Sequence, residues 1–593
     1  MKRLFLLLLF SSFTLSCYIP PPDISKNPLP LKKVRDVVFW PLNSLSFRLS
    51  EVKDKKAFVI ILRDQGQGKV CSISEKYGNQ LKIIMEQEYS KKGFQFIYVY
   101  VGQENPHNMA RLDLKNFEFK APYVVDLKQR IINILSAQTT GEIFILASDR
   151  QMIYRGPLDD SHYRADLTVK NYYVKEVLDD LLTGKKIKTK ELPAPGCIIS
   201  RPKLPIKVYW KDVAPIIKKK CTICHNPRSM GPMNFVRYED VIGRGKMFEY
   251  VIENDLMPPA YVADNLELEF LDGSLGVKEK AMLLKWAKTG FEKEQSFQNE
   301  ALWAEEKMKK WQPDYVIRLP EKVVIPEEGF LYHRFLIDPK FKKDKWIEYV
   351  EWDMKPKVIH HARLYIMKPD FELKRLVDFN KHPPIGIIGF VGRNSRGRQY
   401  HKRKETARGV HFVKIPAEHK LVVEIHYEAL GKEMIDDYSH IKLDFSNKKP
   451  KYQTSILRTD IRNEIHIPPN ESHYHIKKVI PVKKTLSSVY LINSHMHFRG
   501  KRSSLFLIDL NGNRKRIYGI DPYLVPFEKG YLLKKPFHIP KGSTLEYHWW
   551  YDNSLANIFN PNPYKEVLYG LDLVESEMGT TVLWHQVMTH TSK

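Results

Sequence analysis

The sequence predicts a multidomain chain with an α/β domain, then an all-α domain, then two all-β sandwich domains. At about 150 residues per domain, the 593 residues suffice for about four domains. In the first third of the chain, short apolar runs typical of buried strands alternate with segments whose apolar residues have helical spacing. Segments with helical spacing alone come next, and short strands with alternating apolar and polar residues make up the rest. Apolar residues make up 43% and charged residues 28%. This usage excludes a wholly disordered chain, a collagen and a polytopic membrane protein.

The first residues predict an export signal. Lys2 and Arg3 precede an apolar run at 4–13 that is too short to cross a bilayer, and small residues then lead to Cys17. The pattern resembles the lipobox of bacterial lipoproteins. The resemblance implies a signal peptide over 1–17, a lipid anchor to the membrane on Cys17 and a Pro-rich tether over 18–33. The alternative is plain secretion with cleavage nearby.

The expected location is therefore the bacterial cell envelope, with the chain facing the periplasm or the cell surface. The formal net charge is +26, and the basic residues are spread along the chain. An exported protein meets little nucleic acid, so we interpret the charge as solvated faces and expect no nucleic-acid partner.

Residues 34–196 predict an α/β domain. Apolar runs at 57–62 and 94–101 read as strands, 142–154 as a hairpin, and 74–89 and 172–182 as helices. Cys71 lies at a strand-to-helix turn, and Tyr154-Arg155-Gly156 ends the hairpin. These features resemble the redoxin and peroxiredoxin branch of the thioredoxin fold.

The thiol chemistry of that fold does not follow automatically. Cys71 has no resolving cysteine three residues on, Gly68 stands where peroxidatic members have Thr, and Gly141 stands where the fold has a cis-proline. Two interpretations stay open. Cys71 is a reactive thiol with a pKa lowered by a helix N-terminus, or it forms a disulfide with Cys197, since these two cysteines are left over once the others are assigned.

Residues 205–297 carry the attachment signature of a c-type haem. Cys221-Thr222-Ile223-Cys224-His225 places two thiols and an imidazole on one helical turn, where the thiols can add to the haem vinyl groups and His225 can ligate the iron. A zinc knuckle, the alternative, would need further Cys or His ligands nearby. Met257, in a Met-Pro-Pro loop, is the expected sixth ligand, as in one class of cytochrome c domains; Met230, Met233 and Met247 compete.

The last part of the chain predicts two all-β domains, at 312–447 and 448–593, and its histidines follow a distinctive order. A His-His pair at 360–361 comes first, then His426, then His495-Met496-His497, then Met578. The order resembles the copper type II ascorbate-dependent monooxygenases, the group of peptidylglycine α-hydroxylating and dopamine β-monooxygenases.

That resemblance implies two jelly-roll-like domains holding two copper ions. His360, His361 and His426 would bind the electron-donating copper; His495, His497 and Met578 would bind the copper at which oxygen reacts. Three imidazoles suit both copper oxidation states, and a thioether favours Cu(I).

Strand geometry treats the two histidine pairs differently, because successive side chains of a strand point to opposite faces. His495 and His497 share one face of a strand, whereas His360 and His361 need a bulge or a strand end to share a metal. His473-Tyr474-His475 is a rival chelate for the second pair.

Departures from the family limit the expected substrate. Asn493 replaces an arginine that holds the peptide carboxylate in peptide-amidating members, Val582 replaces a tyrosine, and the disulfides of the animal enzymes are missing. An amidated peptide is therefore not the expected product. We expect a monooxygenase that uses O₂ and an unknown organic substrate, fed with electrons through the haem by an ascorbate-like reductant or another cytochrome. The alternatives are a non-catalytic copper- and haem-binding lipoprotein and a thiol-redox protein that uses Cys71.

Overall fold

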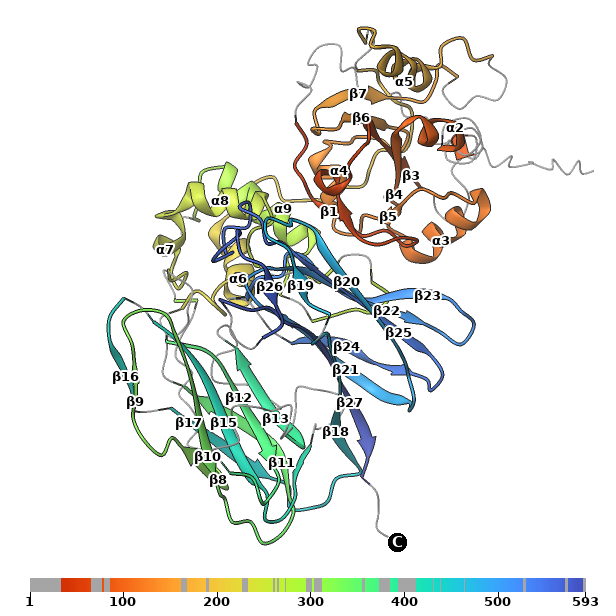
Figure 1. Ribbon diagram of the computed structural model, residues 1–593. Coiled ribbons are helices and arrows are strands. Elements are labelled where there is room, and N and C mark those ends of the chain that lie inside the picture. Colours follow the sequence, from red (N-terminus) through yellow and green to blue (C-terminus); the bar gives the residue numbers. More distant parts are fainter. Residues whose placement is uncertain are drawn as a thin grey trace, which may run out of the picture. The chain divides into compact units, whose positions relative to one another are not determined.

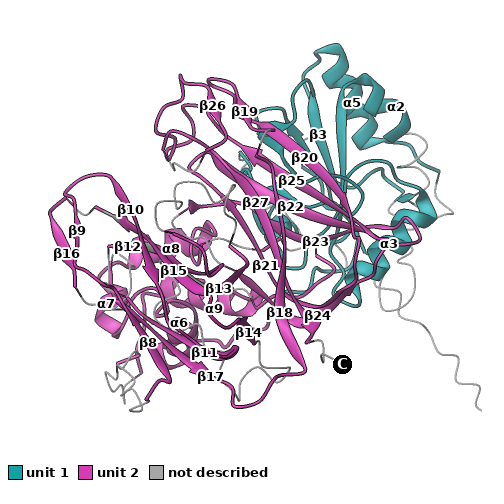
Figure 2. Cartoon of the chain, turned by 60° about the horizontal axis from the view of Figure 1, so that its bottom comes forward, with its two compact units in different colours: residues 1–202 teal, residues 203–593 magenta. Residues whose placement is uncertain are grey.

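The computed structural model describes residues 33–593 except 65–76, 79–80, 82–85, 162–167, 188–190, 227–232, 260–261, 264–265, 272, 295–300, 303–311, 355–357, 373–383, 393–411, 430, 438, 463, 526–529, 571–573 and 590–593. The chain divides into two compact units, residues 1–202 and 203–593 (Figure 2). Among the described residues, no helix is both long enough and apolar enough to span a bilayer.

The first unit is built on a five-stranded sheet of order β5-β4-β3-β6-β7 (Figure 1). Its elements are β1 (Val38–Phe39), β2 (Phe47–Arg48), β3 (Ala57–Arg63), α2 (Gln87–Tyr89), β4 (Phe94–Tyr100), α3 (Pro106–Phe117), β5 (Tyr123–Val125), α4 (Arg130–Ile134), β6 (Ile143–Ala147), β7 (Met152–Gly156) and α5 (Tyr173–Thr183). β3, β4 and β5 are parallel, and β6 and β7 run antiparallel to them as a hairpin. This is a thioredoxin-like topology, and it confirms the predicted α/β domain.

The central strand explains why the sheet forms here. All seven residues of β3 are buried, as expected for a strand covered on both faces. Alternate residues enter two separate cores, one on each face: Val59 and Ile61 join the first, whereas Phe58 and Ile60 join the second. The sequence analysis did not identify β5 and α4, which are only three and five residues long, or α3, whose apolar residues alternate with charged ones.

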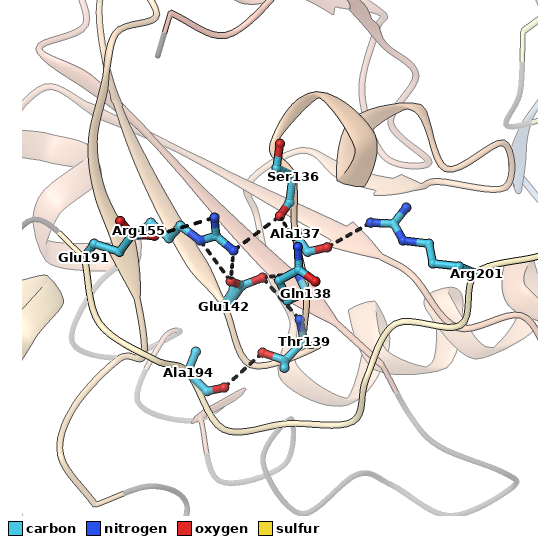
Figure 3. A network of polar contacts seen from close by, with 9 residues as sticks. All are labelled: Ser136, Ala137, Gln138, Thr139, Glu142, Arg155, Glu191, Ala194 and Arg201. Carbon is cyan, nitrogen blue, oxygen red and sulfur yellow. Dashed lines mark hydrogen bonds and ion pairs between the residues drawn. The ribbon is translucent and has the colours of Figure 1, made fainter. Parts of the chain in front are cut away.

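A buried ion pair fixes the segment that enters β6 (Figure 3). Arg155 of β7 donates from Nη2 to Oε1 of Glu142 at 2.7 Å, and both side chains are buried. The other oxygen of Glu142 accepts from the backbone N–H of Gln138 at 2.6 Å and of Thr139 at 3.2 Å. The Thr139 hydroxyl donates to the carbonyl of Ala194 at 3.1 Å. The carboxylate therefore ties the hairpin to the segment before it.

The second unit begins with helices α6 (Trp210–Lys220), α7 (Tyr238–Ile242), α8 (Gly245–Glu253) and α9 (Val277–Lys288). They share a core that includes Trp210, Leu283 and Trp286. The segment between α8 and α9 pairs instead with strands of the C-terminal sandwich, through isolated bridges between Val262 and Ile520 and between Phe270 and Leu533. A separate all-α domain is thus not evident, because the described part of this unit is mostly strand.

Two antiparallel sheets form the first sandwich, with orders β10-β15-β12-β13 and β14-β11-β17-β8. Their strands are β8 (Tyr315–Arg318), β10 (Phe330–Ile337), β11 (Lys345–Asp353), β12 (Ile359–Met367), β13 (Gly386–Gly392), β14 (Val413–Ile415), β15 (Lys420–Glu428) and β17 (His440–Phe445), and a small sheet pairs β9 (Val323–Ile325) with β16 (Met434–Asp436). One core joins the two large sheets; Trp352 of β11 and Leu364 of β12 belong to it and are fully buried.

Two further sheets form the second sandwich, with orders β18-β27-β21-β24 and β20-β25-β22-β23. The strands are β18 (Tyr452–Asp460), β20 (Tyr474–Pro481), β21 (Leu486–Met496), β22 (Gly500–Ile508), β23 (Arg514–Ile520), β24 (Tyr531–Ile539), β25 (Thr544–Tyr551) and β27 (Gly579–Met588), with β19 (His466–Ile467) paired to β26 (Val567–Leu568). Edge strands β23 and β24 are the two that the 262–271 segment bridges.

The Glu142 network predicts a local effect. Replacing Glu142 by Leu removes the acceptor for two backbone amides, so amide exchange at Gln138 and Thr139 should become about 10- to 100-fold faster. Hydrogen exchange read by mass spectrometry measures this. Glu88→Leu, at an exposed ion pair with Lys92, should leave the same peptide unchanged; unchanged exchange in the Glu142 variant would contradict the network.

Candidate metal and haem sites

The first histidine group lies where β12 pairs with β15. His361 stands directly opposite His426, and their ring centroids are 5.1 Å apart. One step earlier, Ile359 pairs with Tyr427, so two residues of β12 span one residue of β15. His360 is the extra residue, so this register shift is a β-bulge, which is one of the two arrangements that would let His360 and His361 share a metal. The side chain of His360 lies outside the described residues.

Aromatic rings surround this pair. Tyr332 of β10 is the cross-strand neighbour of His426 on the other side, and the two rings stack at 4.0 Å. Phe330 lies 5.3 Å from the His426 ring. His361 is 1% exposed and His426 fully buried. The two imidazoles are therefore held in fixed positions by neighbours that leave little room for rotation.

The second histidine group lies where β21 pairs with β27. His495 is opposite Thr580 and Met496 is opposite Gly579, which is the last pair of this ladder. His497 follows the end of β21, and Met578 precedes the start of β27. The rings of His495 and His497 are 5.3 Å apart, and Met578 is buried.

A single carboxyl group organises the backbone of this second group. Glu577 is fully buried. Its Oε1 accepts from the N–H groups of His497 and Met578, the latter at 2.9 Å, and its Oε2 accepts from the N–H of Arg499 at 3.0 Å. Burial raises the pKa of Glu577 to about 8, while these amide donors and Arg499 act to lower it. The turn after β21 is therefore fixed to the start of β27 through one side chain.

The His497 ring has a defined orientation. Its Nδ1 lies 3.0 Å from the carbonyl oxygen of Ser576, which can only accept, so Nδ1 carries the proton. Nε2 is then the nitrogen that is left to bind a metal, an arrangement that metal-binding histidines commonly have. Both residues that fix His497, Ser576 and Glu577, immediately precede Met578.

No group of three or more His, Cys, Asp or Glu side chains within the described part of the chain is close enough to hold a metal. The predicted copper sites are consistent with this finding, since the side chain of His360 is not described and the third ligand of the second group is a methionine. The residues present fit copper in their donor chemistry: imidazoles at the first group, imidazoles and a thioether at the second. The predicted ligand sets stay predictions.

The segment 221–225, where the sequence predicts haem attachment, continues helix α6 by one turn. The N–H of Cys221 donates to Ile217 at 2.8 Å, and the N–H groups of Cys224 and His225 donate to the carbonyl of Cys221 at 3.1 and 2.9 Å. Burial raises the pKa of the Cys221 thiol to about 12. The two thiols and the imidazole thus share one turn beside the helical core.

His225 is oriented like the ligand that the motif predicts. Its Nδ1 lies 3.0 Å from the carbonyl oxygen of Met233, and its ring stacks on Phe235 at 4.6 Å. Burial lowers its pKa, which favours the neutral ring with Nε2 available. Met257 and its competitor Met233 are both half-buried against the same core, Met247 is 41% exposed, and Met230 lies outside the described residues; the sixth ligand stays a prediction.

The cysteine predictions fall largely outside the described residues, which include neither Cys17 nor Cys71. Cys197 is described: its N–H donates to the Thr140 hydroxyl at 3.1 Å, and its carbonyl accepts from the N–H of Thr140 at 3.0 Å. It therefore lies against the Thr140-Gly141 segment, where the thioredoxin fold has its cis-proline. The Cys71–Cys197 disulfide stays a prediction.

The rival histidine pair has a different partner. Nε2 of His475 lies 2.8 Å from Nδ1 of His548, and Nε2 of His548 lies 2.7 Å from a Glu546 oxygen. Arg514 and Lys477 also pair with Glu546, at 2.5 and 2.9 Å. His475 is thus the outer end of a hydrogen-bonded chain that starts at a buried carboxylate.

Sequence reasoning missed three contributors to the sites: Glu577, Tyr332 and Phe330. Glu577 is the neighbour of the predicted ligand Met578, but the sequence does not reveal its role. That role depends on contact between segments about eighty residues apart, which no local pattern encodes. Phe330 and Tyr332 lie on either side of Leu331 in an ordinary-looking apolar strand, so only the register reveals that they meet His426.

Comparison with known proteins gives partial likenesses. No protein-family model matches the chain, and no curated protein matches it. An uncharacterized conserved protein from Geobacillus kaustophilus is 23% identical, with a TM-score of 0.28, over 32% of this chain and 98% of its own. A putative thiol:disulfide interchange protein DsbE from Chlorobium tepidum is 14% identical, with a TM-score of 0.21, over 26% and 96%. StoA from Bacillus subtilis is 11% identical, with a TM-score of 0.18, over 21% and 89%.

The His475 chain predicts a pH response. Burial, followed by the nearby His548, lowers the pKa of His475 to about 4. Because the unfolded value is about 6.5, the neutral ring is favoured by folding, and its contribution to stability is lost as the pH falls from 6.5 toward 4. Ring-labelled NMR should show His475 titrating near pH 4 and moving upward in His548→Gln; titration near 6.5 in the wild type would contradict this geometry.

Proposed function

We propose that this chain is an exported copper-dependent monooxygenase that inserts one oxygen atom of O₂ into a C–H bond of an organic substrate. His360, His361 and His426 hold one copper ion, and His495, His497 and Met578 hold the other. Bound copper supplies one-electron redox chemistry and O₂ activation. The reaction consumes the substrate, O₂, two electrons and two protons, and gives the hydroxylated product and water.

The bulge at His360 is the observation that carries this proposal. A regular strand would send His360 and His361 to opposite faces, whereas a bulge re-aims one side chain. The register shift falls at that residue and nowhere else along the β12–β15 pairing. A bulge beside a cross-strand histidine is what a three-imidazole site on this strand pair requires.

The residues around the second group support the same function. The carboxyl of Glu577 holds the backbone of two predicted ligands, and the Ser576 carbonyl sets the tautomer of His497. Such outer contacts fix ligand direction before any metal binds. An imidazole pair with a thioether is a soft set that suits Cu(I).

A c-type haem at Cys221, Cys224 and His225, with Met257 as sixth ligand, is proposed as the electron carrier. His/Met ligation gives a relatively high potential. The polypeptide links this region directly to the second sandwich: the N–H of Ala263 donates to Gly519 at 2.8 Å, and the N–H of Leu271 donates to Leu532 at 2.7 Å. An electron-carrying segment is thereby attached to the sandwich that holds His495 and His497.

A thiol-redox protein is the second candidate. The thioredoxin-like sheet and the position of Cys197 against Thr140 favour it. In this version Cys71 carries the chemistry, and the β sandwiches are a scaffold. A non-catalytic metal-binding lipoprotein is the third interpretation, in which the same ligands hold copper without turnover.

Metal content tests the proposal. Full-length protein reconstituted with copper should contain one iron and two copper ions, and His361→Ala and His497→Ala should each lose one copper. Elemental analysis with quantitative haem absorbance measures this. One iron with no tightly bound copper would overturn the copper proposal and leave the thiol and the haem as the working chemistry.

Glu577 gives a sharper prediction. Glu577→Gln keeps the size of the side chain but replaces one of its two acceptor oxygens by an NH2 group, which cannot accept from a backbone N–H, so copper affinity at the second site should fall about 10- to 100-fold. A competition titration with a Cu(I) chelator measures the affinity. Glu575→Gln, at an exposed ion pair with Lys565, is the matched control and should bind like the wild type; equal affinities in all three proteins would contradict the role of Glu577.

A further inference from the structure

The loop between β25 and β26, residues 552–566, exposes several large apolar side chains close together in the sequence. Residues 553–564 contain no Asp, Glu, Lys or Arg, in a chain that is 28% charged. Within this loop Leu555 is 69% exposed, Ile558 88%, Phe559 43% and Tyr564 67%. Single exposed apolar residues are common, but a contiguous group of this kind marks a binding surface.

The loop is shaped by its own polar side chains. The Asn557 amide donates to the carbonyl of Asp552 at 2.8 Å, and the Asn560 amide donates to Oδ1 of Asn553 at 3.0 Å. The Asn553 amide in turn donates to the carbonyls of Pro468 and Lys565 at 2.8 and 2.9 Å. The amides thus hold the loop from within, while its large apolar side chains are left in solvent.

The loop is also attached to the second histidine group. The Asn557 amide donates to the carbonyl of Phe498, the residue after His497, at 3.0 Å. Nε of Arg499 donates to Oδ1 of Asn553 at 3.3 Å. The same Arg499 gives its N–H to Glu577. Leu555, Ile558 and Phe559 are within two residues of Asn557, and Asn557 is bonded to the residue that follows His497.

The apolar surface continues toward the first histidine group. The rings of Phe498 and Phe330 are 6.0 Å apart, and Phe330 is 37% exposed and lies 5.3 Å from His426. Rings at such separations are in contact. Phe498 and Phe330 thus form a half-exposed aromatic pair that reaches the neighbourhood of the other predicted copper site, and the hydrogen bond from Asn557 to Phe498 joins this pair to the loop.

We infer that this surface, made of Phe330, Phe498, Leu555, Ile558 and Phe559, binds the hydrocarbon part of the substrate. The substrate is then a neutral organic molecule with an aliphatic or aromatic portion. The inference rests on the proposed function for the identity of the reacting centre. The surface itself is a property of the folded chain and is present without metal.

The charges near the loop favour a small neutral ligand over a membrane surface. Loops that dock on membranes gain from unpaired basic residues around an apolar tip. Here the first basic residue after the loop, Lys565, is paired with Glu575 at 2.5 Å, and Asp552 precedes the loop. A charged substrate would likewise find no opposite charge within residues 553–564.

Binding of 1-octanol tests the inference without copper. Saturation-transfer NMR on the full metal-free chain should show transfer to the octanol chain protons. The double variant Ile558→Asn/Phe559→Asn should bind octanol roughly tenfold more weakly, because two apolar contacts are removed. Leu510→Asn, a 64% exposed leucine at the β22–β23 turn, is the matched control and should bind like the wild type.

Copper-loaded protein separates this inference from the proposed function. With equal copper content, Cu(II) should speed the relaxation of octanol protons in the wild type and in Leu510→Asn, and less so in the double variant. Equal octanol binding by all three proteins would overturn the inference. So would a double variant that keeps octanol binding but loses binding to phosphatidylcholine vesicles, since the loop would then dock on lipid. Octanol binding without copper binding would contradict the proposed function alone.

Discussion

One buried carboxyl group joins the parts of the second histidine group. Glu577 accepts hydrogen bonds from the backbone at His497, Arg499 and Met578, so a turn at the end of β21 and the start of β27 cannot separate without leaving buried donors unsatisfied. The loop that carries the exposed apolar side chains depends on the same contacts, because Arg499 links Glu577 to Asn553. The same set of hydrogen bonds thus positions the predicted copper ligands His497 and Met578 and the loop of the proposed substrate surface.

Strand register is the constraint that both histidine groups have in common. His361 meets His426 across β12 and β15, and Met496, which lies between His495 and His497, is opposite Gly579, the residue after Met578. In each case the residues that meet are distant in sequence. A slip of one residue in either pairing would move the side chains to the other face, so the same core packing that fixes the sheets also fixes the sites.

Some of this organisation could be predicted from the sequence, because it depends on local patterns. The buried strand at 57–62, the helix before Cys221 and the need for a bulge at His360 all follow from apolar spacing and side-chain periodicity. The role of Glu577, the stacking of Tyr332 on His426 and the attachment of 262–271 to β23 and β24 do not, because each depends on pairings between distant segments. The thiol predictions at Cys71 lie outside the described residues and stay predictions.

The copper ligands are the central claim, and X-ray absorption at the copper edge tests them most directly. The reduced, copper-loaded protein should show imidazole scattering from both sites and one sulfur scatterer for every two copper ions, because only the second site has a thioether ligand. Met578→Leu should remove the sulfur and keep the imidazoles, whereas His361→Ala should remove one copper and keep the sulfur. A sulfur signal that persists in Met578→Leu, or imidazole scattering that is missing in the wild type, would contradict the account.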